Sequence, residues 1–339
     1  MRCVINQFSI TRSMQAAGMV AGVFSIFGSA KGTSDAIDID KFMAEPISDR
    51  SKLEKHRTSM QTRMELMIMK IQADFCKALE SEETDESKFT VDRWTRKEGG
   101  GGISCILEEG QVFEKAGVNI SVVHGNLPTD AIKQMKARGR KLSEGGPLPF
   151  FATGVSAVIH PRNPMIPTIH FNYRYFEVTN TDGTWWFGGG TDLTPYYLDE
   201  ADAVHFHKIL KQACDTSSKS YYPRFKKWCD DYFSIPHRGE RRGIGGIFFD
   251  DLDEPSQEEA FEFVTTCAEA FCLTTAKGEI QHTHVFTPNS SAYFRNLICD
   301  TSLYSKFKWQ YMHKPEPDSN ESKLLSVLRE PKDWLNIGE

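Results

Sequence analysis

The feature that most constrains the fold is a series of strand-like runs joined by short turns in the first half of the chain. Ile103–Glu108, Phe150–His160 and Thr168–Val178 are apolar or alternating runs of the kind that form strands. A turn at Thr181–Gly183 leads from the last of these into the aromatic run Trp185–Phe187. Strands joined by such short turns are antiparallel neighbours, so the sequence predicts a large antiparallel sheet.

Helical patterns lie before and after this strand-rich part. Ser51–Glu80 and Glu200–Cys214 have apolar residues at helical spacing. Ser256 with Glu259 is a capping-box pattern that opens a helix through about Cys272. Strand runs followed by helices indicate an α+β domain, and we expect one such domain.

The composition is that of a soluble globular protein, with 339 residues of which 40% are hydrophobic and 25% are charged. Aromatic residues make up 12%, a rich supply for a sheet core or for binding a flat apolar ligand. The formal net charge of -6 argues against a general nucleic-acid binder, which carries a basic surface. The eight cysteines show no CxxC or zinc-finger spacing, so we expect buried thiols rather than disulfides or zinc ligands.

The first 34 residues contain no acidic residue, and they carry Arg2, Arg12, Lys31 and several serines. This composition is typical of a mitochondrial targeting segment, with a secretory signal peptide as the alternative. The apolar run Ala16–Phe27 is shorter than the roughly 20 residues that a membrane-spanning helix needs. We therefore expect a leader over residues 1–40, a single domain over 41–339, and at most peripheral association with a membrane.

The run Thr168–Glu177 is the most informative for function, because alternate side chains of a strand share a face. One face carries three aromatic side chains that can pack on a core: Phe171, Tyr173 and Tyr175. The other face carries three polar side chains within about 14 Å: His170, Asn172 and Arg174. An imidazole, an amide and a guanidinium together can bind carboxylates and move a proton. The alternative is an ordinary solvated sheet face.

A second candidate is the loop His237–Gly246, in which one histidine and three arginines lie between glycines. Guanidinium groups match carboxylates or phosphates, so this loop is a candidate for anion recognition. Its spacing is not that of a P-loop. The alternative is a structural loop whose arginines pair with Asp250 or Asp251.

The sequence does not predict a dedicated metal site. His205 and His207 are two residues apart on a predicted helix, so they do not share a face. His282 and His284 could share a strand face, but no carboxylate partner is evident. A metal-dependent oxygenase that uses His170 or this last pair is kept as an alternative.

Several long motifs together resemble one family. They are Asp92–Trp94 with Lys97–Ser104, Phe113–Asn119, His160–Pro164, His170–Glu177, Trp185–Pro195 and His237–Asp251. The likeness is to the oxygen-dependent coproporphyrinogen III oxidases, and it runs nearly unbroken from about Phe42 to about Phe271. This resemblance implies an α+β fold with a large antiparallel sheet flanked by helices on both sides, and a homodimer.

The resemblance also implies the activity. The family uses O2 to convert two propionates of coproporphyrinogen III to vinyl groups, which releases CO2 and gives protoporphyrinogen IX in haem biosynthesis. The partners would be coproporphyrinogen III and O2, with no metal or organic cofactor and no nucleic acid. Animal members lie in the mitochondrial intermembrane space, which agrees with the acid-free leader.

Matching the motifs residue by residue implies a set of site residues. The positions matching catalytic residues are His170, His237, Asp192 and Arg242. The positions matching substrate-binding residues are Ser156, Asn172, Tyr173, Arg174, Asn289, Ser290 and Ser291. By this likeness His170 is the proton donor. We expect Asp192 to hold pyrrole N–H groups, and Arg174 and Arg242 to grip propionates.

The match fails after Phe271, where several dozen residues of the family pattern are missing. Cys272–Gln281 stands where the family has a helical stretch and a strand, so we expect an internal deletion near 272–285. Phe286–Ser291 resembles the family's FTPGSR, with Ser291 in place of arginine. A splice variant or gene-model error would explain the gap, and so would a diverged protein. The gap predicts reduced or absent oxidase activity, with a tetrapyrrole-binding or dimer-partner protein as the alternative.

Overall fold

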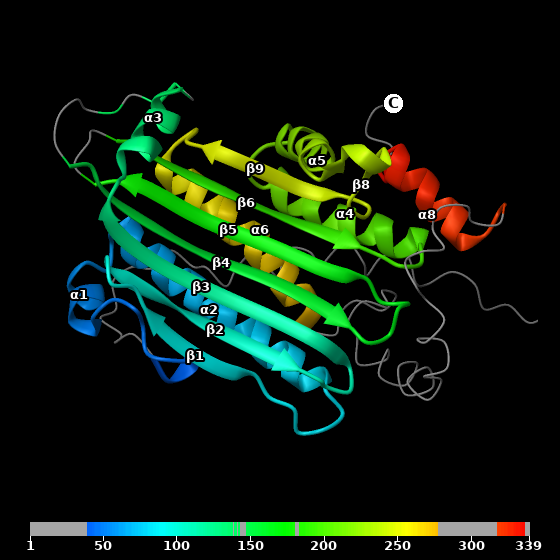
Figure 1. Ribbon diagram of the computed structural model, residues 1–339, viewed down its shortest axis with the longest axis horizontal. Coiled ribbons are helices and arrows are strands. Elements are labelled where there is room, and N and C mark those ends of the chain that lie inside the picture. Colours follow the sequence, from blue (N-terminus) through cyan, green and yellow to red (C-terminus); the bar gives the residue numbers. More distant parts are fainter. Residues whose placement is uncertain are drawn as a thin grey trace, which may run out of the picture. The chain divides into compact units, whose positions relative to one another are not determined.

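A computed structural model describes residues 39–137, 139–140, 142, 147–179, 183–276 and 317–335, without the side chains of 39 and 271–276. Its centre is a seven-stranded sheet in the order β1-β2-β3-β4-β5-β6-β9 (Figure 1). The strands are β1 (Thr90–Thr95), β2 (Gly100–Glu108), β3 (Phe113–Asn126), β4 (Pro149–Pro161), β5 (Thr168–Val178), β6 (Trp185–Thr194) and β9 (Gly246–Leu252). Every neighbouring pair is antiparallel, which confirms the predicted sheet.

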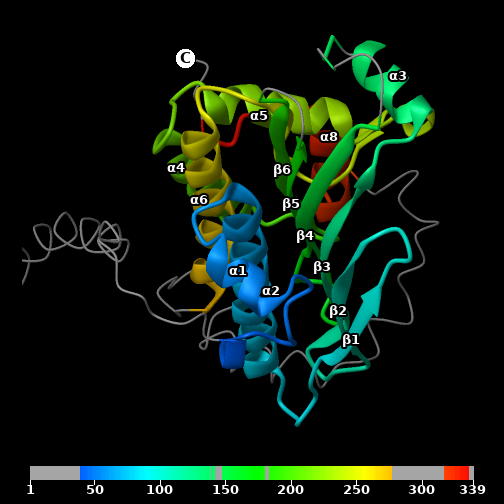
Figure 2. The same cartoon turned by 90° about the vertical axis from the view of Figure 1, so that its left-hand side faces the viewer.

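Helices form the second layer of the domain. They are α1 (Arg50–Lys55), α2 (Met60–Glu82), α3 (Thr129–Ala137), α4 (Glu200–Asp215), α5 (Tyr221–Tyr232), α6 (Gln257–Ala276) and α8 (Asn320–Arg329). Helices α2, α4 and α6 lie behind the sheet in Figure 1 and as a layer on one side of it in Figure 2. The α+β fold class is therefore confirmed, and among the described helices these three cover one face of the sheet.

Smaller elements complete the described part of the chain. They are the 3-10 helices η2 (Ile39–Lys41) and η3 (Pro236–Arg238), and a two-stranded sheet of β7 (Ser234–Ile235) and β8 (Glu240–Arg241). Helix α8 packs against β8, while α5 packs against β9. None of the described helices is both long enough and apolar enough to cross a bilayer.

Strand β5 has the two faces that its sequence predicts. Phe171, Tyr173 and Tyr175 are at most 1% exposed and lie in the core. Phe75 of α2 meets the Phe171 ring edge-on, with ring centroids 5.2 Å apart. We call this helix-packed side of the sheet the covered face. The side that carries His170, Asn172 and Arg174, each only partly buried, we call the open face.

The sequence predicts one helix over Ser51–Glu80, whereas the structure has two, α1 and α2, separated at residues 56–59. Ser59 accounts for the break. Its side-chain oxygen accepts a hydrogen bond from the Thr62 backbone N–H at 3.3 Å, and its own backbone is extended. A capping serine in this conformation starts a new helix, so a continuous one cannot run through it.

The helix start predicted at Ser256 is confirmed, with Ser256 as its capping residue. Ser256 Oγ accepts from the Glu259 backbone N–H at 3.2 Å and donates to the Glu259 carboxylate at 2.6 Å. The described cysteines are free and buried, as expected: Cys76, Cys105, Cys214, Cys229 and Cys267. The predicted leader, the deletion near 272–285 and the residues His282, His284, Asn289, Ser290 and Ser291 lie almost entirely outside the described residues.

Candidate functional site

A histidine–aspartate pair lies at the centre of the open face. His170 of β5 and Asp192 of β6 are direct cross-strand partners, and His170 Nδ1 lies 2.8 Å from Asp192 Oδ1. The Asp192 side chain is 1% exposed, while that of His170 is 27% exposed. Because the carboxylate accepts the Nδ1 proton, the His170 Nε2 atom of the neutral ring is left with a lone pair. The pair can therefore hold and move a proton at Nε2.

Arg242 completes this cluster from the loop between β8 and β9. Its Nε donates to Asp192 Oδ2 at 3.0 Å, and a terminal nitrogen donates to Oδ1 at 2.8 Å. Such a two-pronged contact is the strong form of an arginine–carboxylate pair and gives the buried Asp192 charge its partner. The guanidinium carbon also lies 3.6 Å from the centre of the Phe233 ring, a cation–π contact. Arg242 is still 38% exposed, so its outer edge is accessible.

Arg174 forms a second cationic centre on the same face. Its guanidinium donates to the Asn172 side-chain oxygen at 2.8 Å and pairs with Asp250 Oδ1 at 3.0 Å. Gly188, the cross-strand partner of Arg174, makes this possible. A Cβ at Gly188 would lie 2.7 Å from Asp250 Oδ1 and 2.8 Å from the Arg174 Nε, so glycine leaves the space in which the pair forms.

The contacts of Arg174 and Arg242 correct one prediction. The alternative in which an arginine of the loop His237–Gly246 pairs with Asp250 or Asp251 is wrong. Arg242 pairs with Asp192 instead, and the partner of Asp250 is Arg174 of β5. The loop therefore binds the β6 carboxylate beside the histidine, which sequence spacing alone does not reveal.

The rest of the open face is a shallow floor of small polar and apolar residues. Ser156 of β4 is the cross-strand partner of Asn172 and, on its other side, of Asn119. Val158 is the partner of His170 and is 36% exposed, and Ile106 of β2 is 39% exposed. This floor could contact an apolar ring system while the arginines contact its acidic groups.

The structure brings most of the predicted site residues together. Five of them share the open face: His170, Asp192, Arg174, Asn172 and Ser156. Arg242 joins them from its loop. Tyr173 lies on the covered face, 0% exposed, with its hydroxyl 2.7 Å from Thr191 Oγ1, so its side chain supports the sheet. His237 is exposed in η3, and in the described part of the chain no hydrogen bond joins it to the cluster.

Two residues that lie beside the predicted site were not found by sequence reasoning. Phe233 meets both Arg242 and His170, the latter with ring centroids 6.3 Å apart and nearly perpendicular planes. Nothing in the local pattern marks it, because it comes from the end of α5. Asn119 could have been found from the alternation along β3. It is the cross-strand partner of Ser156 and therefore lies on the same face.

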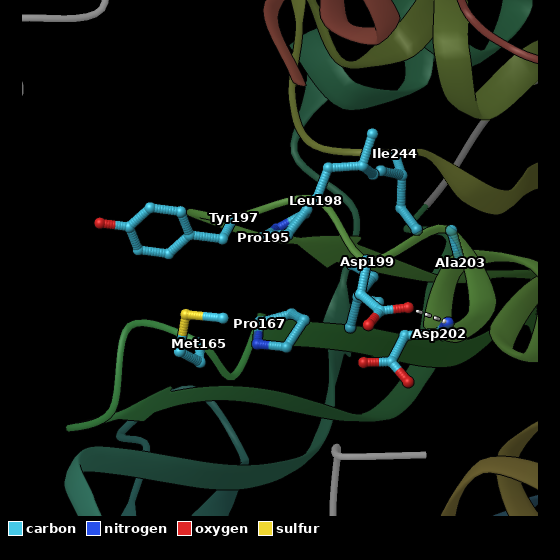
Figure 3. A pocket seen from close by; sticks show the side chains of 10 residues that line it. Met165, Pro167, Pro195, Tyr197, Leu198, Asp199, Asp202, Ala203 and Ile244 are labelled. Atoms are coloured by element: carbon cyan, nitrogen blue, oxygen red, sulfur yellow. Dashed lines mark hydrogen bonds between the residues drawn. The ribbon is translucent and has the colours of Figure 1, made fainter. Parts of the chain in front are cut away.

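A small hollow lies apart from these residues, at the start of α4. Figure 3 shows it between Met165 and Pro167 on one side and Pro195 and Tyr197 on the other, and its other lining residues are Leu193, Leu198, Asp199, Asp202, Ala203 and Ile244. Its empty space of about 230 Å³ includes open solvent, so it is a minor surface depression and not an enclosed cavity. Neither His170 nor Arg174 lines it, so the candidate site is the open face.

Burial shifts the pKa values of several groups behind the site. It lowers the pKa of His207 to about 3 and raises the pKa of the Cys229 thiol well above its usual range. Burial also raises the pKa of Tyr222. These groups are therefore uncharged near neutral pH. Within the described ranges no cluster of three or more His, Cys, Asp or Glu side chains could hold a metal ion.

The chain matches the coproporphyrinogen III oxidase family over residues 63–293. It is 54% identical over 329 residues to the oxygen-dependent coproporphyrinogen-III oxidase of Drosophila melanogaster, covering 88% of this chain and 84% of the fly protein. The mitochondrial oxygen-dependent enzyme of Rattus norvegicus is 52% identical over 326 residues, with 87% and 73% covered. Coproporphyrinogen-III oxidase 1, chloroplastic, of Arabidopsis thaliana is 45% identical over 314 residues, with 82% and 80% covered. The chain belongs to the oxygen-dependent coproporphyrinogen III oxidase family.

Proposed function

We propose that this protein converts two propionates of coproporphyrinogen III to vinyl groups by O2-dependent oxidative decarboxylation, giving protoporphyrinogen IX in haem biosynthesis. The observation that carries the proposal is the cluster of His170, Asp192 and Arg242, with Arg174 nearby on the same sheet face. The names of the relatives support the same reaction.

The open face suits a macrocycle that carries carboxylate groups at its rim. Coproporphyrinogen carries four propionates around apolar pyrroles. The exposed edges of Arg174 and Arg242 offer guanidinium forks to the propionates, and a fork matches a carboxylate in geometry as well as charge. Val158 and Ile106 offer apolar surface to the pyrroles. Asp192 is 1% exposed and both of its oxygens are bonded, so in place of the expected contact with pyrrole N–H groups we propose that it orients His170 and Arg242.

The stoichiometry gives His170 its role. Two propionates that become vinyl groups release two CO2, two protons and four electrons. Reduction of one O2 to two waters takes up four electrons and four protons, so two further protons must be supplied. We propose His170 as the donor: with Nδ1 held by Asp192, the Nε2 atom first takes up a proton to give the imidazolium and then passes it to the reduced oxygen. O2 is the co-substrate, and we propose no metal or organic cofactor.

The test is conversion of coproporphyrinogen III by the purified protein in air and under nitrogen, with the porphyrins separated by chromatography after oxidation. Protoporphyrin should form in air alone, with two CO2 released for each substrate molecule. Turnover should survive thorough chelation. Absence of any O2-dependent conversion would overturn the proposal, and loss of turnover on chelation would favour a metal-dependent oxygenase.

The proposed internal deletion bears on the rate. The alignment with the fly protein spans 329 positions but includes only 88% of the 339 residues of this chain. This difference supports gaps in this chain when it is compared with the fly protein. We therefore propose that turnover is slower than in a family member that has the segment after Phe271. Equal rates for this chain and the fly protein, measured side by side, would contradict the effect of the gap.

Location and assembly are further proposals. The mammalian relatives are named mitochondrial, which supports a mitochondrial location for this chain. We propose the intermembrane space as its compartment, to be tested by protease protection in mitochondria with intact inner and ruptured outer membranes. We also propose a homodimer, which sedimentation equilibrium would reveal as twice the monomer mass.

A further inference from the structure

A second histidine, His207 of α4, lies behind the site and makes two hydrogen bonds. It is 0% exposed, so both of its ring nitrogens need partners inside the protein. Its Nε2 lies 3.0 Å from the carbonyl oxygen of Ile244, and its Nδ1 lies 2.9 Å from the Tyr222 hydroxyl. Ile244 is two residues after Arg242, in the same loop.

The direction of these hydrogen bonds follows from chemistry. Burial lowers the pKa of His207 to about 3, so the ring is neutral and carries one N–H. A carbonyl can only accept, so that proton is on Nε2 and is donated to Ile244. Nδ1 is then an acceptor, and the Tyr222 hydroxyl donates to it. Tyr222, His207 and Ile244 thus form a chain of two hydrogen bonds that leads from α5 through α4 to the loop.

The same loop is fastened to β6 next to Asp192. The Ile244 N–H donates to the Leu193 carbonyl at 3.0 Å, and the Leu193 N–H donates to the Gly245 carbonyl at 3.2 Å. Gly243 has φ +64°, and a Cβ there would lie 2.1 Å from the Leu193 oxygen, so only glycine permits this close approach. The loop position that presents Arg242 to Asp192 is therefore fixed from two sides.

We propose that His207, oriented by Tyr222, is a positioning residue for Arg242, holding the loop so that the guanidinium grips Asp192 and faces the substrate. This inference rests on the proposed function for its effect on turnover. His207 acts through the loop and does not reach the open face. Packing alone is the competing explanation, because His207 also stacks on Trp334 at 6.2 Å.

A double-mutant cycle separates the two explanations. In the otherwise unchanged protein, His207→Phe should lower kcat/KM by about tenfold, and Tyr222→Phe by less, because it leaves the bond to Ile244 in place. In an Arg242→Ala background, His207→Phe should cause no further loss, since the side chain that it positions is gone. Equal losses in both backgrounds would show that His207 acts independently of Arg242 and would overturn the inference.

The control is Tyr175→Phe, which also removes a buried tyrosine hydroxyl. Tyr175 accepts a hydrogen bond from Gln257 at 2.7 Å on the covered face, away from the loop. It should lower thermal stability without changing kcat/KM in either background. His207→Gln keeps an N–H donor for the Ile244 carbonyl, so it should recover part of the activity that His207→Phe loses. No recovery would contradict the hydrogen-bond explanation.

A readout that needs no turnover keeps this test distinct from that of the proposed function. Trypsin cleaves after Arg241 and Arg242, which lie in or beside the loop. His207→Phe should raise the native-state cleavage rate there about fivefold, while Tyr175→Phe should not change it. If the wild-type protein has no oxidase activity, the proposed function fails and this rate alone decides the inference. An unchanged rate in His207→Phe would overturn it.

Discussion

The two faces of β5 differ although their residues alternate along a single strand. On the covered face, Phe171, Tyr173 and Tyr175 are at most 1% exposed and pack against helices or neighbouring strands. On the open face, His170, Asn172 and Arg174 make polar contacts and stay partly accessible. One strand thus carries both the core and the site, and the two are separated only by the direction of the side chain.

This difference predicts which substitutions should change stability and which should change turnover. A sheet whose covered face is fully packed provides a rigid support, so the open face can hold charged groups at fixed spacing. Substitutions on the two faces of β5 should therefore have separable effects. Those on the covered face should change the free energy of unfolding, and those on the open face should change turnover.

The largest expected effect is that of His170→Ala on the open face. Loss of the proton donor should lower kcat by roughly 10²–10⁴-fold, the range for general acid–base catalysis. The melting temperature should change little, because the His170 side chain is 27% exposed. Steady-state kinetics beside a thermal melt checks both parts. A kcat within threefold of wild type would remove His170 from the mechanism.

On the covered face, Phe171→Ala should destabilise the protein by about 3–5 kcal/mol, the usual cost of truncating a buried phenylalanine. The cavity would open beside Phe75 of α2. Urea denaturation measures the free energy, and activity is then expressed per folded molecule. Unchanged stability, or a fall in kcat per folded molecule as large as that of His170→Ala, would break the separation of the two faces.

Acid should lower the free energy of unfolding through His207, which lies on α4 in the helical layer over the covered face. The folded pKa of His207 is about 3, below the ordinary value of 6.5, so the unfolded chain binds more protons than the folded one between these values. The contribution of His207 is therefore fully present above pH 6.5 and is lost as pH falls from 6.5 towards 3. Thermal melts across this range should show a shallower decline in His207→Gln than in wild type. Parallel declines would contradict this assignment.

Arg174→Gln should raise KM for coproporphyrinogen by roughly 10–100-fold with a smaller change in kcat, since a hydrogen bond to a charged group contributes about 1.5–3 kcal/mol. The matched control is Arg63→Gln. Arg63 is also partly exposed and forms an ion pair with Glu258. It lies on α2, one of the helices that cover the other face of the sheet. Equal KM values for Arg174→Gln and wild type would exclude a substrate contact at this position.

The smallest effect should come from Ser156→Ala, which removes one neutral hydroxyl from the open-face floor. A neutral hydrogen bond contributes about 0.5–1.5 kcal/mol, so KM should rise about threefold. Thr153→Val, a change on the covered face of the same strand, should leave KM unchanged while lowering stability, because Thr153 donates to the Ser121 carbonyl. If Thr153→Val raises KM more than Ser156→Ala, the assignment of faces on β4 fails.

The alternation along β5 could be predicted from sequence, because a period of two follows from strand geometry. The pairing of His170 with Asp192 could not be worked out from spacing, since it depends on the register between β5 and β6. The approach of Arg242 depends on a loop that returns from β8, and the contact of Arg174 with Asp250 depends on the place of β9 beside β6. Family motifs named these residues, and tertiary geometry determined their partners.

The most direct test of the open-face assignment is a crystal structure of the protein with coproporphyrin III, the stable oxidised form of the substrate. The macrocycle should lie on the open face over β4, β5 and β6, with propionates in hydrogen-bond contact with Arg174 and Arg242 and with His170 beside one of the pyrrole rings. A porphyrin bound elsewhere, with those three side chains out of its reach, would contradict the account.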